Sequence, residues 1–238
     1  MLTKHQGQEV HGFMRYACAF FTGKYRRQVS SEVMALSPST SCKSVKGVTS
    51  FCDYAIQMLQ AACPRRLDSA IEKRPLLIFT DECWEPNFAG IGAILVDMAT
   101  GQKLVCNGVV PDALIRKWNQ LDGDHIIYQV ELYVMVLIRW RFRSLLLNRK
   151  SIWLVDIGST RYCAIKGLSQ SPIMLFLVRE FYELDSESPT YSWIERVPSS
   201  SNLPDGPSRH ECTEALRILD IAHVTPFEHP DELAGRLL

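Results

Sequence analysis

Three acidic side chains stand where folding would bring them to one edge of a sheet. Asp81 directly follows the apolar run 76–80, and Asp156 directly follows the apolar run 151–155. Both runs predict buried strands, and ligands of open α/β sheets bind beyond the strand ends, so the two carboxylates would meet if the strands are neighbours. Glu131 lies on the apolar side of a predicted helix, where a carboxylate is costly to bury without a partner such as a metal ion.

Each of these carboxylates also has a simpler interpretation. An Asp at the end of a strand is more often a turn residue. Glu131 can equally pair with an arginine or lie at the margin of the apolar stripe. A fourth acid, Asp205, stands in the irregular segment 198–208, and the four together are more specific than any one alone.

The elements that must position these acids follow from hydrophobic periodicity. It predicts the order strand, strand, strand, helix, strand, helix, helix, strand, helix. The strands are expected at 76–80, 89–96, 102–109, 151–155 and 191–197, and the first three helices at 125–143, 159–166 and 171–184. Gly167 is expected to end the second helix, and Ser171 and Pro172 to begin the third. Such an order predicts a mixed sheet covered by helices.

The chain has a basic first third and an acidic remainder. Residues 1–75 hold 11 Lys+Arg and 5 Asp+Glu, whereas residues 76–238 hold 15 and 21. A basic arm suits a polyanion and an acidic body suits metal ions, although unevenly solvated surfaces explain the split nearly as well. Helical spacing over 1–35 and 49–62 predicts a helical N-terminal segment, followed by a charged linker.

Composition narrows the class of protein. Hydrophobic residues make up 47% and charged ones 22%, which is typical of a globular chain. The eight cysteines include no CxxC pair, so neither a structural zinc site nor a disulfide framework is indicated. No secretion signal is visible, and the apolar stretch 126–147 contains four charged residues, so no membrane span is expected. We expect an intracellular protein, cytoplasmic or nuclear.

Five segments give the sequence a resemblance to the ribonuclease H domains of reverse-transcribing elements. They are 78–81, 90–97, 129–131, 153–156 and 197–209, the last reading VPSSSNLPDGPSR. The resemblance implies an RNase H-like α/β fold over 75–212, with a mixed five-stranded sheet and helices on both faces. It also implies that 1–74 is a helical thumb or connection remnant of a reverse transcriptase, and 213–238 a C-terminal helix and tail.

The same resemblance implies a metal-dependent endonuclease that hydrolyses the RNA strand of RNA–DNA hybrids. Two Mg²⁺ or Mn²⁺ ions about 4 Å apart would activate water and neutralise the leaving oxygen. Asp81 would bridge the ions, Glu131 and Asp156 would complete one shell, and Asp205 the other. Substrate binding is expected of Asn202, Ser208 and Arg209. The expected partners are the hybrid and the polymerase part of a reverse transcriptase.

Departures from the family pattern keep two rivals open. Glu82 stands where the family usually has Gly, and a long acid there is expected to obstruct the hybrid or repel its phosphates. Ile157 replaces the usual Asn, and His210 follows the last acid, either to assist product release or as a surface residue. The first rival is a catalytically inactive RNase H-like domain that binds nucleic acid or protein. The second is a related exonuclease or transposase-like strand transferase.

Two further groups have open interpretations. The basic residues after the central helix would contact DNA-strand phosphates or simply form a solvated helix end; they are Arg139, Arg141, Arg143, Arg149 and Lys150. Three tryptophans are expected in the core or at its edge rather than as base-stacking platforms. They are Trp84, Trp153 and Trp193.

Overall fold

The computed structural model describes most of the chain after Pro75. The described residues are 74–85, 88–123, 126–167, 169, 171–231, 233 and 235, with the isolated residues 5, 9, 53, 56 and 60. The predicted helices over 1–35 and 49–62 therefore fall outside the described residues almost entirely.

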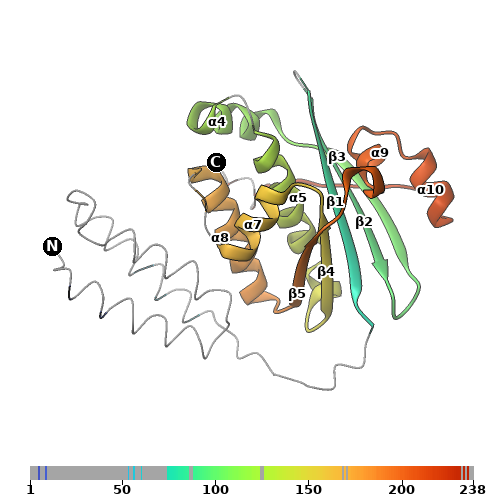
Figure 1. Cartoon of the computed structure of the whole chain (residues 1–238), viewed down its shortest axis with the longest axis horizontal. Coiled ribbons are helices and arrows are strands. Elements are labelled where there is room, and N and C mark those ends of the chain that lie inside the picture. The colour runs from blue at the N-terminus through green and yellow to red at the C-terminus, as the bar shows by residue number, and fades with distance from the viewer. Residues whose placement is uncertain are drawn as a thin grey trace.

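A single mixed sheet forms the middle of the described chain (Figure 1). Its order is β5–β4–β1–β2–β3–β6. The bounds are β1 Leu76–Glu85, β2 Phe88–Asp97, β3 Lys103–Val109, β4 Lys150–Val155, β5 Tyr191–Arg196 and β6 Thr225–Pro226. The first three strands form an antiparallel meander, and β4 runs parallel to both β1 and β5.

Helices cover both faces of the sheet (Figure 1). One face carries α5 (Ile127–Arg141), α7 (Gly158–Lys166) and α8 (Pro172–Glu187), with α4 (Asp112–Asp122) against α8 and α6 (Arg143–Leu146) after α5. The other face carries α9 (Asp205–Ser208) and α10 (Thr213–Leu219), reached through the 3₁₀ turn η1 (Ser199–Ser201). The predicted mixed sheet with helices on both faces is confirmed.

Helix α5 is the centre of the core. Its residues from Gln129 to Arg139 are all buried, because the helix packs against β1 and β2 on one side and α8 on the other. A helix enclosed in this way is apolar around its whole circumference and need not be amphipathic. The acid Glu131 is thus carried on a rigid element directly over the sheet.

Local signals around α7 and α8 act as expected. Gly167 ends α7 with φ 69°, a left-handed conformation that glycine adopts at little cost. The Ser171 side chain accepts a hydrogen bond from the Met174 N–H at 3.0 Å, which caps the start of α8.

Three features of the fold were not predicted. Helix α4 buries Leu114 and Trp118, four residues apart on one face, in a stretch to which the sequence analysis assigned no element. The two-residue β6 makes the sheet six-stranded, because the Phe227 N–H donates to the Asn107 carbonyl on the otherwise free edge of β3. Trp193 was expected in or near the core, but it lies on the edge strand β5 with 65% of its surface exposed.

No helix within the described ranges is long and apolar enough to cross a bilayer.

Candidate metal centre

The candidate site forms where β1 loses its parallel partner. Pairing with β4 stops at Phe79 opposite Leu154, whereas pairing with β2 continues to Glu85 at the end of β1. Asp81 therefore lies inside β1 rather than after it, which corrects the predicted strand end. From Thr80 onward, the edge that faced β4 is free of strand pairing, and the residue that follows β4 is Asp156.

Alternation along β1 sends neighbouring acids to opposite faces of the sheet. Ile78 belongs to the core under α5, and Phe79 packs with the cluster under α10. Because side chains in a strand alternate, Glu82 shares the α5 face with Ile78, and Asp81 shares the α9–α10 face with Phe79. Both carboxylates stand beside the free edge of the strand.

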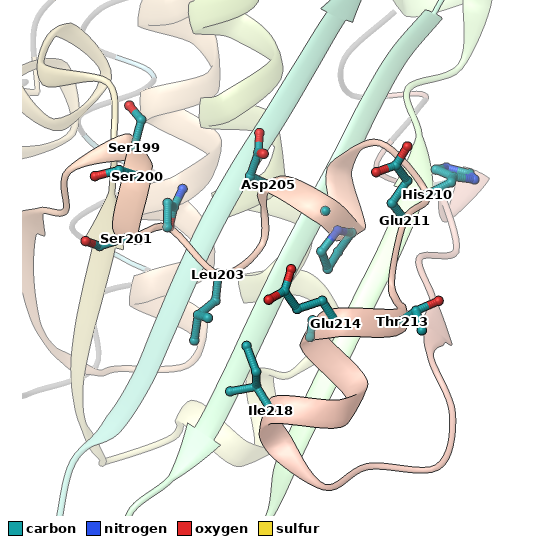
Figure 2. Close-up of a pocket in the computed structure, with 14 residues that line it drawn as sticks. Ser199, Ser200, Ser201, Leu203, Asp205, His210, Glu211, Thr213, Glu214 and Ile218 are labelled. Atoms are coloured by element: carbon teal, nitrogen blue, oxygen red, sulfur yellow. The ribbon is translucent and has the colours of Figure 1, made fainter.

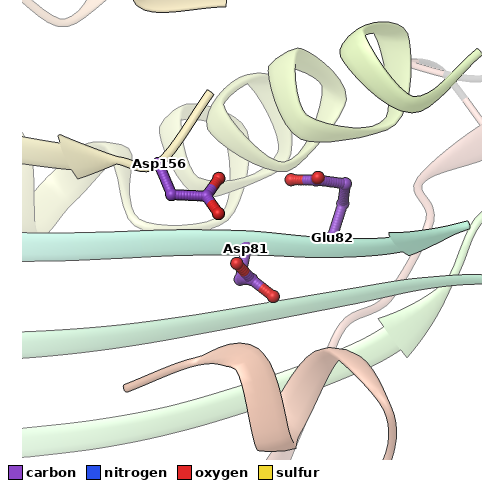
Figure 3. Close-up of side chains that lie close together, drawn as sticks. All are labelled: Asp81, Glu82 and Asp156. Carbon is purple, nitrogen blue, oxygen red and sulfur yellow. The ribbon is translucent and has the colours of Figure 1, made fainter. Parts of the chain in front are cut away.

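Three carboxylates converge at this edge (Figure 3). Asp81, Glu82 and Asp156 each offer an oxygen atom, and these three atoms lie within 4.8 Å of one another. They are the sole trio of potential ligands this compact among the residues that the structure describes. In Figure 3 the carboxylates of Glu82 and Asp156 point toward one another.

Glu82 is the member that the sequence did not predict as a ligand. It was expected to project toward the hybrid, but only 8% of its surface is exposed and its charge acts on Glu131, Asp81 and Asp156. The expectation of obstruction is therefore not supported by its position. The missed signal is the period-two pattern Ile78, Thr80, Glu82, which continues past the predicted end of the strand.

Asp81 is held from the α9 side by two side chains. The Asn202 side-chain amide donates to Asp81 Oδ1 at 2.7 Å and to the Thr80 carbonyl at 2.9 Å. The Ser208 hydroxyl donates to Asp81 Oδ2 at 2.9 Å. Both residues were predicted to bind substrate; the structure shows that they orient a carboxylate, and contact with substrate remains a prediction.

Two glycines in β2 allow the α9 segment to come this close. A Cβ on Gly92 would lie 2.5 Å from the Ser208 nitrogen and 2.6 Å from the Pro204 carbonyl oxygen. A Cβ on Gly90 would collide with the Ser208 carbonyl oxygen. Because neither Gly90 nor Gly92 has a side chain, Ser208 can reach across β2 to Asp81 on β1.

Glu131 reaches the site from α5 and is fully buried. Its Oε1 accepts a long hydrogen bond, 3.5 Å, from the Ile157 N–H just after Asp156. Burial raises the pKa of the Glu131 carboxyl; the Thr160 hydroxyl opposes the rise, and the charges of Asp156 and Asp81 add to it. Glu131 thus borders the compact trio on the α5 side without belonging to it.

Asp205 borders the site on the opposite face, at the start of α9. Its side chain is 58% exposed, and its Oδ1 lies 3.3 Å from Arg209 Nε. The charge of Asp205 contributes to the raised pKa of Asp81, but its oxygens lie outside the compact trio. Arg209 also pairs with Glu85 at 3.3 Å, so it fastens α9 to the end of β1; phosphate binding by Arg209 remains a prediction.

Oxygens without partners mark the site as suited to a cation. Glu82 Oε2, Glu131 Oε2 and Asp156 Oδ1 are buried and have no hydrogen-bond partner among the described residues. Burial raises the pKa of Asp81 to about 7, opposed by hydrogen bonds from Ser208 and Asn202 and reinforced by the charges of Asp156 and Asp205. Burial and neighbouring carboxylates also raise the pKa of Glu82. Hard oxygen donors with surplus negative charge fit Mg²⁺ or Mn²⁺.

A separate groove opens beside Asp205, between η1, α9 and α10 (Figure 2). Glu211 and Glu214 line it, so it would repel a polyanion rather than bind one. His210 also lines this groove, with its Nε2 3.2 Å from the Gly108 carbonyl and its ring edge-on to Phe88. That position favours a structural contact for His210.

The five basic residues at and after the end of α5 divide into two groups, because Arg141, Arg143 and Lys150 are exposed whereas Arg139 and Arg149 are buried. Arg139 pairs with Asp185 at 2.8 Å, and both side chains are almost completely buried. Arg149 pairs with Asp97 through two contacts, 2.7 and 3.0 Å. Two members of the group are therefore structural ion pairs, because distant acids neutralise them inside the fold.

Among the comparisons with known proteins, only the comparison with solved structures gives matches. No protein-family model matches the sequence, and no curated protein does either. RNase H1 from the halophilic archaeon Halobacterium salinarum is 14% identical with a TM-score of 0.46, covering 59% of this chain and 99% of that chain. LC11-RNase H1, isolated from compost, is 15% identical with a TM-score of 0.47, covering 60% and 98%. A structure of LC11-RNase H1 with an RNA/DNA hybrid gives 14%, 0.40, 59% and 99%. Structural similarity at this level does not indicate which reaction this chain catalyses.

Proposed function

We propose that this chain is a metal-dependent endonuclease that hydrolyses the RNA strand of RNA–DNA hybrids. The observation that carries the proposal is a set of buried carboxylate oxygens on Glu82, Glu131 and Asp156 that have no hydrogen-bond partner among the described residues, around the free edge of β1. A buried carboxylate is costly unless an opposite charge or hydrogen bonds compensate it. A bound cation supplies that opposite charge to several carboxylates at once.

The predicted ligands would divide the site between them. Asp81 and Asp156 are the central ligands, with Glu131 on the α5 side and Asp205 on the α9 side. Two divalent ions held there would supply an activated water and a neutralised leaving oxygen. The protein's own part is orientation: Asn202 and Ser208 fix Asp81, and the Ser199 hydroxyl donates to Asp156 at 3.0 Å.

A nucleic-acid substrate is supported by the position of one arginine at the rim. Arg196 is exposed, and its Nε donates to the Asp156 carbonyl oxygen at 3.1 Å, which places a guanidinium beside the acids. Such a group suits a phosphate contact. Selectivity for RNA would rest on 2′-hydroxyls read across the wide minor groove of the hybrid.

We also propose an origin in a reverse-transcribing element, with its polymerase as a partner. The support is the resemblance of segment 197–209, in which Asn202 and Ser208 turn out to hold Asp81. Sequencing the transcript tests the origin. A polymerase reading frame upstream of this chain is the expected result, and a transcript without one argues against it.

The activity is tested with a labelled RNA–DNA hybrid and Mg²⁺ or Mn²⁺. We compare the wild-type chain with Asp81→Asn, and with Glu187→Gln as a control that removes one exposed carboxylate at the end of α8. Asp81→Asn should cut cleavage by more than about 100-fold, because losing even a partner of a metal ligand costs about 10–100-fold. Glu187→Gln should cleave like the wild type.

The rival functions give different results in the same assay. Hybrid binding by the wild-type chain without cleavage would assign it to the inactive binding domains, and degradation of DNA from an end would assign it to the exonucleases. Glu82, the feature that favoured the inactive alternative, is buried beside the site's acids, and its effect on turnover is a question for this assay.

A further inference from the structure

Glu82 is buried among like charges and has an oxygen that no group in the described residues satisfies. Only 8% of the residue is exposed, and its Oε2 has no hydrogen-bond partner within the described part of the chain. An oxygen of Glu82 lies within 4.8 Å of oxygens on both Asp81 and Asp156. Glu131 approaches from α5 with its own unpartnered oxygen.

A structural role for this side chain does not account for its surroundings. A buried acid that stabilises a fold is paired with a cation or receives several hydrogen bonds. Two other buried acids follow that rule: Asp97 pairs with Arg149, and Asp185 pairs with Arg139. Glu82 instead extends from β1 toward Asp156, as Figure 3 shows.

We propose that Glu82 is a direct ligand of a divalent cation in this site. The inference rests on the proposed function only in requiring that a cation binds here, and it adds a fifth carboxylate to the four predicted ones. The side chains of Asp81 and Glu82 project from opposite faces of β1, so the ion would be held from both sides of the strand. Asp156, directly after β4, would be the third ligand.

An additional carboxylate changes which ion the site prefers. Mg²⁺ retains several waters and usually binds through one or two carboxylates, whereas Ca²⁺ accepts about six to eight oxygen ligands in flexible geometry. Affinity for either ion rises with the number of charged ligands. Glu82 therefore strengthens binding overall and favours Ca²⁺ relative to Mg²⁺.

Isothermal titration of the full chain with Mg²⁺, Mn²⁺ and Ca²⁺ tests this without relying on cleavage. The variants are Glu82→Gln, which keeps the shape and removes the charge, and Glu82→Asp, which withdraws the charge by one methylene. Asp81→Asn serves as the positive control, and Glu187→Gln, at the exposed end of α8, as the charge-matched control away from the site. Circular dichroism in EDTA confirms that each variant is folded.

We expect Glu82→Gln to weaken Mn²⁺ binding at least about tenfold, the lower bound for disturbing a ligand's surroundings. Ca²⁺ binding should fall more than Mg²⁺ binding, Glu82→Asp should be intermediate, and Glu187→Gln should match the wild type. Unchanged binding in Glu82→Gln, with binding lost in Asp81→Asn, overturns the role of Glu82 and leaves the proposed function standing. A wild-type chain that binds none of the three ions overturns the metal-dependent function itself.

Discussion

The two ends of the central strands both bury carboxylates, but only one end supplies them with arginines. At the β1 start, Asp97 of β2 forms two contacts with Arg149, at 2.7 and 3.0 Å. Nearby, Arg139 pairs with Asp185 at 2.8 Å and stacks over the Phe181 ring at 4.3 Å. At the other end, beyond the last residue of β4, the buried acids meet one another instead.

The presence or absence of a paired arginine separates acids that stabilise the fold from acids that are suited to bind a cation. Hydrogen bonds from Arg149 hold the pKa of Asp97 well below its usual range, despite burial. Burial raises the pKa of Asp81 to about 7, and the nearby charges of Asp156 and Asp205 add to the rise. The same sheet thus pairs its buried acids with arginines at the end that only stabilises the fold. At the end where a cation would bind, it leaves the acids without an opposite charge.

The largest expected effect comes from breaking an arginine pair. Asp185→Asn removes the charge that pairs with the buried Arg139, and removing one partner of a buried pair costs about 3–5 kcal/mol. Urea unfolding measures the loss of free energy. Glu228→Gln is the matched control, because its pair with Arg141 is exposed and such pairs contribute about 0.2–1 kcal/mol. Equal losses in both variants would erase the distinction between buried and exposed pairs.

The two ends should also respond to pH with opposite sign in EDTA. Asp97 has a folded-state pKa below its unfolded value of about 3.9, so its contribution is present above that value and lost as pH falls. Asp81 has a folded-state pKa of about 7, so the stability it confers is full below about pH 4 and is lost as pH rises toward 7.

Urea unfolding of the wild type and two variants between pH 3 and 8 measures these slopes. Asp97→Asn should reduce the loss of stability on the acid side. Asp81→Asn should reduce the loss between about pH 4 and 7. If Asp81→Asn loses as much stability between about pH 4 and 7 as the wild type does, the ionised Asp81 carboxylate does not destabilise the metal-free fold.

The sequence allowed the acidic end to be predicted much better than the paired end. Asp81 and Asp156 could be expected at one edge because the apolar runs before them are local patterns, although β1 continues past Asp81. Glu131 was expected from helix periodicity and Asp205 from the resemblance of its loop, and both border the compact trio without belonging to it. The arginine pairs could not be placed, since Arg149 meets Asp97 across 52 positions of sequence and nothing local predicts the contact. Five basic residues close together in sequence suggested one exposed surface, but the fold buries two of them, Arg139 and Arg149.

Glu82 escaped prediction for a different reason. The end of β1 depends on which neighbour is considered: pairing with β4 stops at Phe79, but pairing with β2 runs on to Glu85. Nothing in the local sequence indicates that β1 continues along β2 after its pairing with β4 has stopped. The alternation that assigns Glu82 to the α5 face became meaningful only once the strand was known to continue.

The smallest expected effect concerns the neutral hydrogen bonds that hold the acidic end in place of arginines. The Ser199 hydroxyl donates to Asp156 Oδ2 at 3.0 Å from an exposed turn. Ser199→Ala should weaken Mn²⁺ binding about tenfold, at the low end of the effect of such partners, because water can replace an exposed hydroxyl. Ser199→Thr should restore binding, and Ser200→Ala in the same turn should leave it unchanged. Calorimetric titration measures all three, and equal weakening by both alanine variants would mean that the turn, not the hydroxyl, positions Asp156.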